Sequence, residues 1–99
     1  MPGIDEVVHC EREFCSPFHG YGKMENASRL GYRAGLCVAQ QRFEEAEQLL
    51  NLARTQLEDA KPLIWPIDAF GNRMLSELEK HCTNAELELS VGKLLRVIP

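Results

Sequence analysis

The sequence lacks most of the features that mark a specialised class of protein. It has one tryptophan, and no run approaches the roughly 18 consecutive apolar residues that cross a bilayer. Its 11 basic side chains are outnumbered by 15 acidic ones, and a formal charge of −4 argues against nucleic-acid binding as the main role. The 44% hydrophobic and 26% charged content excludes a disordered chain and a disulfide-dense miniprotein. We expect one domain with one core over residues 1–99.

The acidic side chains gather near the N-terminus. Residues 1–26 carry two basic and five acidic side chains, so a basic partner would meet the chain there, and Glu11, Glu13 and Glu25 are candidate partner-binding residues. Asp5 and Glu6 stand where a secretory signal carries basic residues. We therefore expect a cytoplasmic location and no membrane association, with the four cysteines as thiols or metal ligands rather than disulfides.

The first quarter of the chain is dense in turn-forming residues. Residues 16–22 hold most of them, which predicts a loop-rich acidic cap over residues 1–25 and a helical core over residues 26–99. Asn26 is the expected N-cap of the first helix. Gly31 and Gly35 lie inside that helix, where each costs about 1 kcal/mol relative to alanine. We expect the helix to tolerate them because another backbone approaches closely.

Residues 43–60 carry the clearest helical pattern. Their apolar residues step by three and four, with Glu44 and Glu45 in the first turn, where the helix dipole favours negative charge. The stripe consists of Phe43, Ala46, Leu50, Ala53, Leu57 and Ala60. Because this spacing also suits a seam between two helices, a homodimer through the 43–60 helix is a further prediction.

An apolar connector follows, in which Pro62 ends the helix. Trp65 lies between two prolines and either fills the core, the favoured interpretation, or stays exposed as an anchor for a partner. With its neighbours Leu63 and Ile64 it forms a second set of candidate partner-binding residues.

The last third of the chain admits two interpretations. Asp68 is the expected cap of a third helix, whose face holds Phe70, Met74, Leu78 and Cys82. Thr83 then opens a capping box for a fourth helix, with an apolar stripe of Leu87, Val91, Leu94, Leu95 and Ile98. Residues 85–98 also alternate at the period of a strand, with a turn at Gly92, so a C-terminal β-hairpin and an α+β fold are the alternative.

Residues 30–60 resemble one helical hairpin of the tetratricopeptide repeat. The packing residues stand at the spacing of that motif, and residues 42–46 resemble its turn and the start of its second helix. The chain departs from the motif at Gln41, where the repeat has glycine, and at Glu58, where it has proline. The packing residues concerned are Leu30, Ala34, Cys37, Ala46, Leu50 and Ala53. The resemblance covers about a third of the chain and implies a protein-binding helical scaffold.

One cluster has the chemistry of a metal site. His9, Cys10, Cys15 and His19 combine two thiols and two imidazoles in a turn-rich segment, and zinc prefers four such ligands. The spacing differs from that of common zinc modules, and the alternative is that both cysteines simply pack. No nucleophile–base pair or phosphate-binding loop is evident, so we expect no enzyme and no cofactor other than zinc.

The expected fold is therefore all-α: a small bundle of three or four helices with a loop-rich N-terminal cap. The function expected of it is non-catalytic. Such a chain would bind and modulate a partner protein as an adaptor or inhibitor, in the manner of phage or mobile-element antagonists of host enzymes or defence complexes. Two alternatives stay open: a small zinc-stabilised module, and a small regulatory nucleic-acid binder using Arg29 and Arg33.

Overall fold

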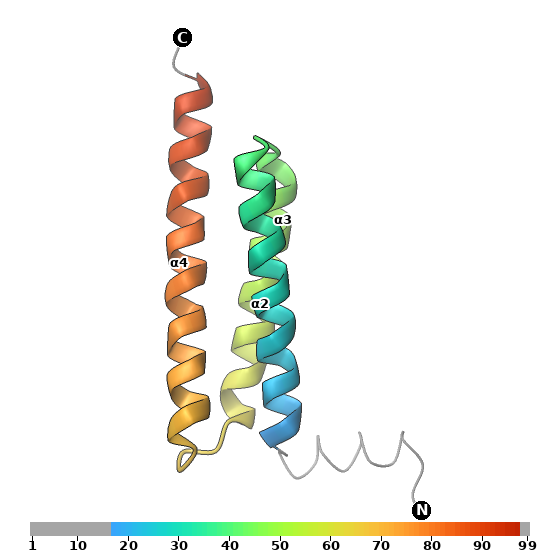
Figure 1. The fold of residues 1–99 in the computed structure, drawn as a ribbon, viewed down its shortest axis with the longest axis vertical. Helices are drawn as coiled ribbons and strands as arrows, with labels where there is room; N and C mark the ends of the chain where they lie inside the picture. The colour runs from blue at the N-terminus through green and yellow to red at the C-terminus, as the bar shows by residue number, and fades with distance from the viewer. Residues whose placement is uncertain (1–16, 98–99) are drawn as a thin grey trace, which may run out of the picture.

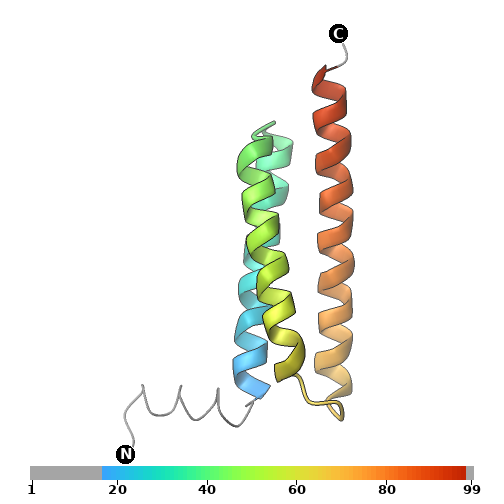
Figure 2. The same cartoon turned by 180° about the vertical axis from the view of Figure 1, so that it is seen from behind.

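Residues 17–97 fold into three helices that run up, down and up (Figure 1). A computed structural model describes residues 17–97, and within that range it contains no strand. The helices are α2 (Pro17–Ala39), α3 (Phe43–Ala60) and α4 (Ala69–Val97), with a 3-10 turn, η1 (Lys61–Leu63), after α3. Helices α2 and α3 form an antiparallel pair, and α4 lies alongside it (Figure 2). The predicted all-α class is confirmed.

The hairpin of α2 and α3 packs through alternating large and small side chains. The buried face of α3 consists of Phe43, Ala46, Leu50, Ala53, Leu57 and Ala60, the predicted stripe in full. Helix α2 covers it with Met24, Ala27, Ala34 and Cys37, all buried. Small residues at every second position let the two backbones approach closely, while the large ones fill the space between them.

Helix α2 begins at Pro17, so the prediction of a loop at residues 17–25 and of an N-cap at Asn26 is wrong. Proline is favoured at the start of a helix because it needs no N–H partner there. Tertiary contacts then override the turn propensity of the segment. Met24 is fully buried, and a Cβ on Gly20 would lie 2.7 Å from Cδ1 of Ile64, so this turn is pressed against the connector after α3. The remainder of the predicted cap, residues 1–16, lies outside the described residues.

The turn from α2 to α3 uses the left-handed conformation that usually calls for glycine. Gln41 has a φ of 60°. The N–H of Gln41 donates to the carbonyl of Val38 at 3.0 Å, and the N–H of Arg42 donates to that of Cys37 at 2.8 Å. These two bonds form a Schellman motif, which satisfies the last carbonyls of α2. Glutamine thus takes a left-handed position where glycine is usual.

Helix α4 is one continuous helix of 29 residues, so the predicted break at Thr83 and the alternative hairpin at 85–98 are both wrong. Asp68 caps it as predicted, because its Oδ1 accepts the N–H of Gly71 at 2.8 Å. The hydroxyl of Thr83 bonds back to the carbonyl of Glu79 at 3.0 Å instead of opening a new helix. The residues of α4 that face the hairpin follow a heptad spacing: Gly71, Leu75, Leu78, Cys82, Ala85, Leu89 and Gly92.

The register of α4 exposes the apolar stripe that the sequence placed on a fourth helix. Phe70 is 63% exposed, and four apolar residues of the C-terminal half are 54–63% exposed: Leu87, Val91, Leu94 and Leu95. Because a helix turns 100° per residue, an unbroken α4 that buries Leu75, Cys82 and Leu89 cannot bury these residues as well. None of the helices in residues 17–97 is long and apolar enough to cross a membrane.

Candidate functional site

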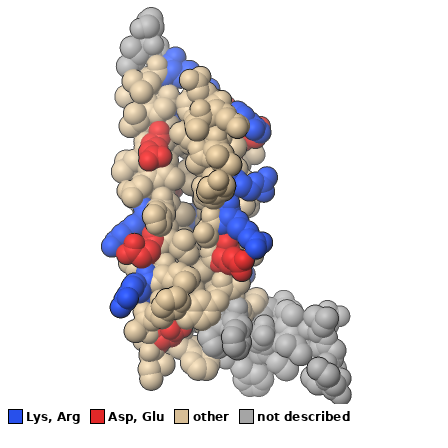
Figure 3. All heavy atoms as spheres, viewed as in Figure 1, with Lys and Arg blue, Asp and Glu red and all other residues tan. Residues whose placement is uncertain are grey.

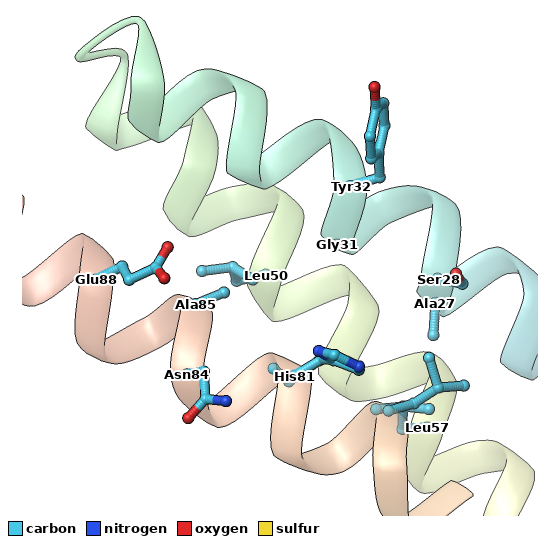
Figure 4. A pocket seen from close by; sticks show the side chains of 12 residues that line it. Ala27, Ser28, Gly31, Tyr32, Leu50, Leu57, His81, Asn84, Ala85 and Glu88 are labelled. Atoms are coloured by element: carbon cyan, nitrogen blue, oxygen red, sulfur yellow. The ribbon is translucent and has the colours of Figure 1, made fainter. Parts of the chain in front are cut away.

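A groove lies between α2 and α4. Its volume is ≈ 440 Å³, and α3 forms its floor (Figure 4). The residues that line it are Ala27, Ser28, Gly31 and Tyr32 from α2, Leu50 and Leu57 from α3, and Leu78, His81, Cys82, Asn84, Ala85 and Glu88 from α4. In the space-filling view the strip between the two helices is mostly uncharged, and most charged side chains lie along its outer edges (Figure 3). The groove is therefore an apolar trough with polar rims.

The groove exists because α2 and α4 meet at one end of the bundle. There the hydroxyl of Tyr21 donates to the carboxylate of Asp68, and the rings of Tyr21 and Phe70 lie 6.5 Å apart. The hydrogen bond lowers the pKa of Asp68, with a further contribution from the N–H of Gly71, and it raises the pKa of Tyr21. This contact closes the base of the groove, above which the two walls are separated by the open trough.

Further along, α4 packs against both other helices and forms ion pairs with α3 and η1. The four pairs are Arg54–Glu86, Lys61–Glu79, Lys93–Glu47 and Arg96–Glu44. A Cβ on Gly92 would lie 2.8 Å from Cε1 of Phe43, which shows how closely α4 approaches α3 near the C-terminus. Each exposed ion pair contributes at most about 1 kcal/mol, so these pairs supplement the packing of α4 in the two core clusters.

A second, smaller hollow lies further along the same two helices. Its volume is ≈ 290 Å³, and it runs between the C-terminal end of α2 at Val38 and α4 at Leu95. Taken from Leu78 to Leu95, the two hollows follow about 26 Å of α4 at 1.5 Å per residue. That length matches about five turns of a helix.

The wall of the groove on α2 is made of small residues. Nothing in the described chain lies within 4 Å of the place where a Cβ on Gly31 or Gly35 would stand. The predicted close approach of another backbone to these glycines is therefore not made within residues 17–97. Gly31 costs stability without a packing contact that requires glycine.

Glu88 is the one charged residue among those that line the main hollow. Glu88 and His81 extend from α4 toward the opposite helices, whereas Tyr32 points outward from α2 (Figure 4). Charged side chains elsewhere on α2 and α4 form ion pairs. Glu25 accepts from Arg29 at 2.7 Å, and Arg96 pairs with Glu44 while lying 5.1 Å from the ring centre of Phe43. Among residues 17–97, none forms an ion pair with Glu88.

The predicted zinc cluster falls mostly outside the described residues. His9, Cys10 and Cys15 belong to residues 1–16, and His19 is half-buried in the first turn of α2. Within residues 17–97, no three His, Cys, Asp or Glu side chains lie close enough to hold a metal ion.

The two described cysteines both pack in the bundle. Cys37 and Cys82 are buried, as the sequence suggested. Burial is the largest cause of a raised pKa for the Cys82 thiol, although the Arg54 guanidinium opposes it. A thiol held in its protonated form is a poor nucleophile, so this position fits packing better than catalysis.

The candidate partner-binding residues differ in where the structure places them. Glu11 and Glu13 lie outside the described residues, and Glu25 is exposed on α2 and paired with Arg29.

The three candidate residues of the connector also differ in their burial. Ile64 is buried in the core cluster, Leu63 is half-buried, and Trp65 is 46% exposed. The favoured interpretation of Trp65 as a core residue is therefore wrong, and its side chain is accessible at the base of the bundle.

The helix expected to form a homodimer is covered within the chain. Its stripe is the floor between α2 and α4, and every residue of that stripe is buried. This stripe therefore packs within the fold, and the homodimer through the 43–60 helix stays a prediction.

The groove was not predicted from the sequence, in which Gly31 was expected only as a glycine that the helix tolerates. The heptad spacing from Gly71 to Gly92 was the signal that could have placed Ala85 and Glu88 beside α2. Comparison of the chain with protein families, with characterised proteins and with solved structures finds no match.

Proposed function

We propose that this chain is a non-catalytic protein-binding module whose groove between α2 and α4 takes a helix of a partner protein, as an adaptor or inhibitor would. The observation that carries the proposal is the groove itself, a hollow of ≈ 440 Å³ between α2 and α4 with a mostly apolar lining. Helical bundles bury such seams with a further helix, and helix-in-groove docking is a common mode of peptide recognition.

Two further observations support this function. The walls offer small side chains at Ala27, Gly31 and Ala85, which leave room for the backbone of an incoming helix. The rims carry groups that can form hydrogen bonds, among them Ser28 and Asn84, which suit the polar edge of an interface. The resemblance of residues 30–60 to a tetratricopeptide hairpin points to the same class of function.

A site-specific crosslinking experiment tests the proposal. A photo-reactive amino acid at Ser28 or Ala85 in the groove should form a protein adduct in cells of the organism that encodes the chain. The matched position is Ser76, which is exposed on α4 but does not line the groove. Adducts at the groove positions and not at Ser76 are the expected result, whereas equal adducts at all positions would contradict the proposal.

A groove-filling variant provides the control for specificity. Gly31→Leu places a side chain in open space within the groove, so the helix should tolerate it while the partner cannot enter. Gly22→Leu makes the same change on α2, also in open space, at a position outside the groove. We expect Gly31→Leu to abolish the adduct and Gly22→Leu to retain it.

A further inference from the structure

We infer that the occupant of the groove is a basic amphipathic helix from another protein, with a lysine or arginine placed against Glu88. This inference rests on the function proposed above and adds the chemistry of the partner. It follows from the charge that the groove presents, from its length, and from what a second copy of the chain would bring to it.

The charge of the groove is the first step. Glu88 is the one charged residue in its lining, and it forms no ion pair among residues 17–97. A docked helix would remove much of the water around this carboxylate, and an acidic group is costly to desolvate unless a base replaces the water. A positive side chain on the occupant satisfies Glu88, whereas a negative one would repel it.

The shape of the groove sets the rest of the chemistry. Its lining is mostly apolar, and Leu78 and Ala85 on α4 are only half-buried there, so the occupant needs an apolar face. Helix α2 spans about 17 Å from Ala27 to Val38, and α4 spans about 26 Å beside it, at 1.5 Å per residue. The groove therefore accommodates roughly 11–17 helical residues. Because Gly31 has open space around it, a residue of the occupant can lie directly on the α2 backbone.

A second copy of the chain fits these requirements poorly. A two-fold interface places the same patch on both sides, so two grooves facing each other would bring one Glu88 toward the other. Each copy also carries a net charge of −4, which disfavours association. The exposed stripe of Leu87, Val91 and Leu94 would enter a groove with Glu86 and Glu88 beside it. Charge complementarity thus points to a basic partner.

Two synthetic 16-residue peptides test the inference on the full-length chain. Both have the same leucine face and a helical sequence, and their polar faces carry lysine in one peptide and glutamate in the other. Isothermal titration calorimetry with each peptide should give a lower Kd for the lysine peptide, and that Kd should rise with salt.

Three variants separate the explanations. Glu88→Gln should weaken binding of the lysine peptide about two- to fivefold, the effect of one exposed ion pair. Glu58→Gln removes the same charge from an exposed position of α3 outside the groove and should leave Kd unchanged. Gly31→Leu fills the groove and should abolish binding of either peptide.

The outcomes distinguish this inference from the function on which it rests. If both peptides bind equally, or if Glu88→Gln and Glu58→Gln weaken binding alike, the groove still takes a helix but its charge does not select a basic one. If binding survives Gly31→Leu, or if neither peptide binds, the groove is not the binding site and the proposed function fails with it. A concentration-dependent dimer in sedimentation analysis that Gly31→Leu abolishes would identify a second copy as the occupant.

Discussion

Substitutions at two glycines, Gly31 and Gly92, allow the effect of helix propensity on stability to be measured separately from the effect of packing. Gly31 and Gly92 both lie inside long helices, so replacing either with alanine should stabilise its helix by about 1 kcal/mol through backbone propensity. Their surroundings differ. A Cβ on Gly31 meets nothing within 4 Å, whereas a Cβ on Gly92 would lie 2.8 Å from Cε1 and 3.1 Å from Cζ of Phe43.

The expected magnitudes follow from this difference. Gly31→Ala should raise the free energy of unfolding by about 1 kcal/mol, which shifts Tm upward by roughly 4–8 °C in a domain of this size. In Gly92→Ala the new methyl group presses on the ring of Phe43, which is 4% exposed and cannot move into solvent. Overpacking of this kind costs about 1–3 kcal/mol. Gly92→Ala should therefore end between neutral and about 2 kcal/mol less stable than the parent chain.

Urea unfolding followed by circular dichroism at 222 nm measures both values. Gly22→Ala is the matched control for Gly31→Ala, because a Cβ there also meets nothing within 4 Å. The two variants should be stabilised alike. If Gly92→Ala is stabilised as much as Gly31→Ala, α4 is not pressed against Phe43 and the packing described above is refuted. If Gly31→Ala is destabilised, the groove is filled in the free protein.

Other predictions concern the turn, the base of the groove and the thiols. Gln41→Gly should stabilise the chain by about 1 kcal/mol in urea unfolding because Gln41 has positive φ, and an unchanged stability would contradict the left-handed turn. The pKa of Asp68 is lower in the folded chain than in the unfolded chain. The charged carboxylate therefore stabilises the fold fully at pH values above the pKa of the unfolded state, and this stabilisation is lost as pH falls through the pKa of the folded state. Asp68→Asn should therefore lower Tm at neutral pH and less so in strong acid, and Tyr21→Phe should reproduce part of the loss, since Tyr21 is the largest cause of the shift. In a variant whose other cysteines are replaced by serine, Cys37 and Cys82 should react with a thiol reagent only after the chain unfolds. Fast reaction in the native state would contradict their burial.

Local sequence patterns predicted the helices well where packing and periodicity agree. The stripe from Phe43 to Ala60 faces the core as the spacing required, and Asp68 caps the next helix because an aspartate before a helix has few competing roles. The prediction failed at Gly20, where turn propensity is overridden by a contact with Ile64 from a distant part of the chain. Such long-range contacts leave no trace in a local window.

The C-terminal helix shows a different limit of the sequence. Residues 69–97 contain two apolar stripes, one through Leu75, Cys82 and Leu89 and the other through Leu87, Val91 and Leu94. Each has helical spacing, so periodicity alone cannot decide which one is buried. The stripe that is buried is the one that packs against the hairpin of α2 and α3, where Leu75, Cys82 and Leu89 join the two core clusters. The groove could not be predicted for the same reason, because it depends on which side of α4 turns toward α2.

At Gly31, a larger side chain is expected to stabilise the free chain but to weaken binding of a helix in the groove. These opposite effects provide a specific test of the groove. A small domain has only about 5–15 kcal/mol of net stability, so a mid-helix glycine that costs about 1 kcal/mol is a measurable loss. No contact in the described chain requires a glycine at this position, but a helix lying on the α2 backbone would. If the groove binds a helix, substitutions that stabilise the free chain at Gly31 must weaken the complex, and more so as the new side chain grows from alanine to leucine. The same series at Gly22 should change stability without changing binding. If stability rises while affinity falls at Gly31 but not at Gly22, the glycine at position 31 serves binding. Neither helix propensity nor internal packing distinguishes the two positions.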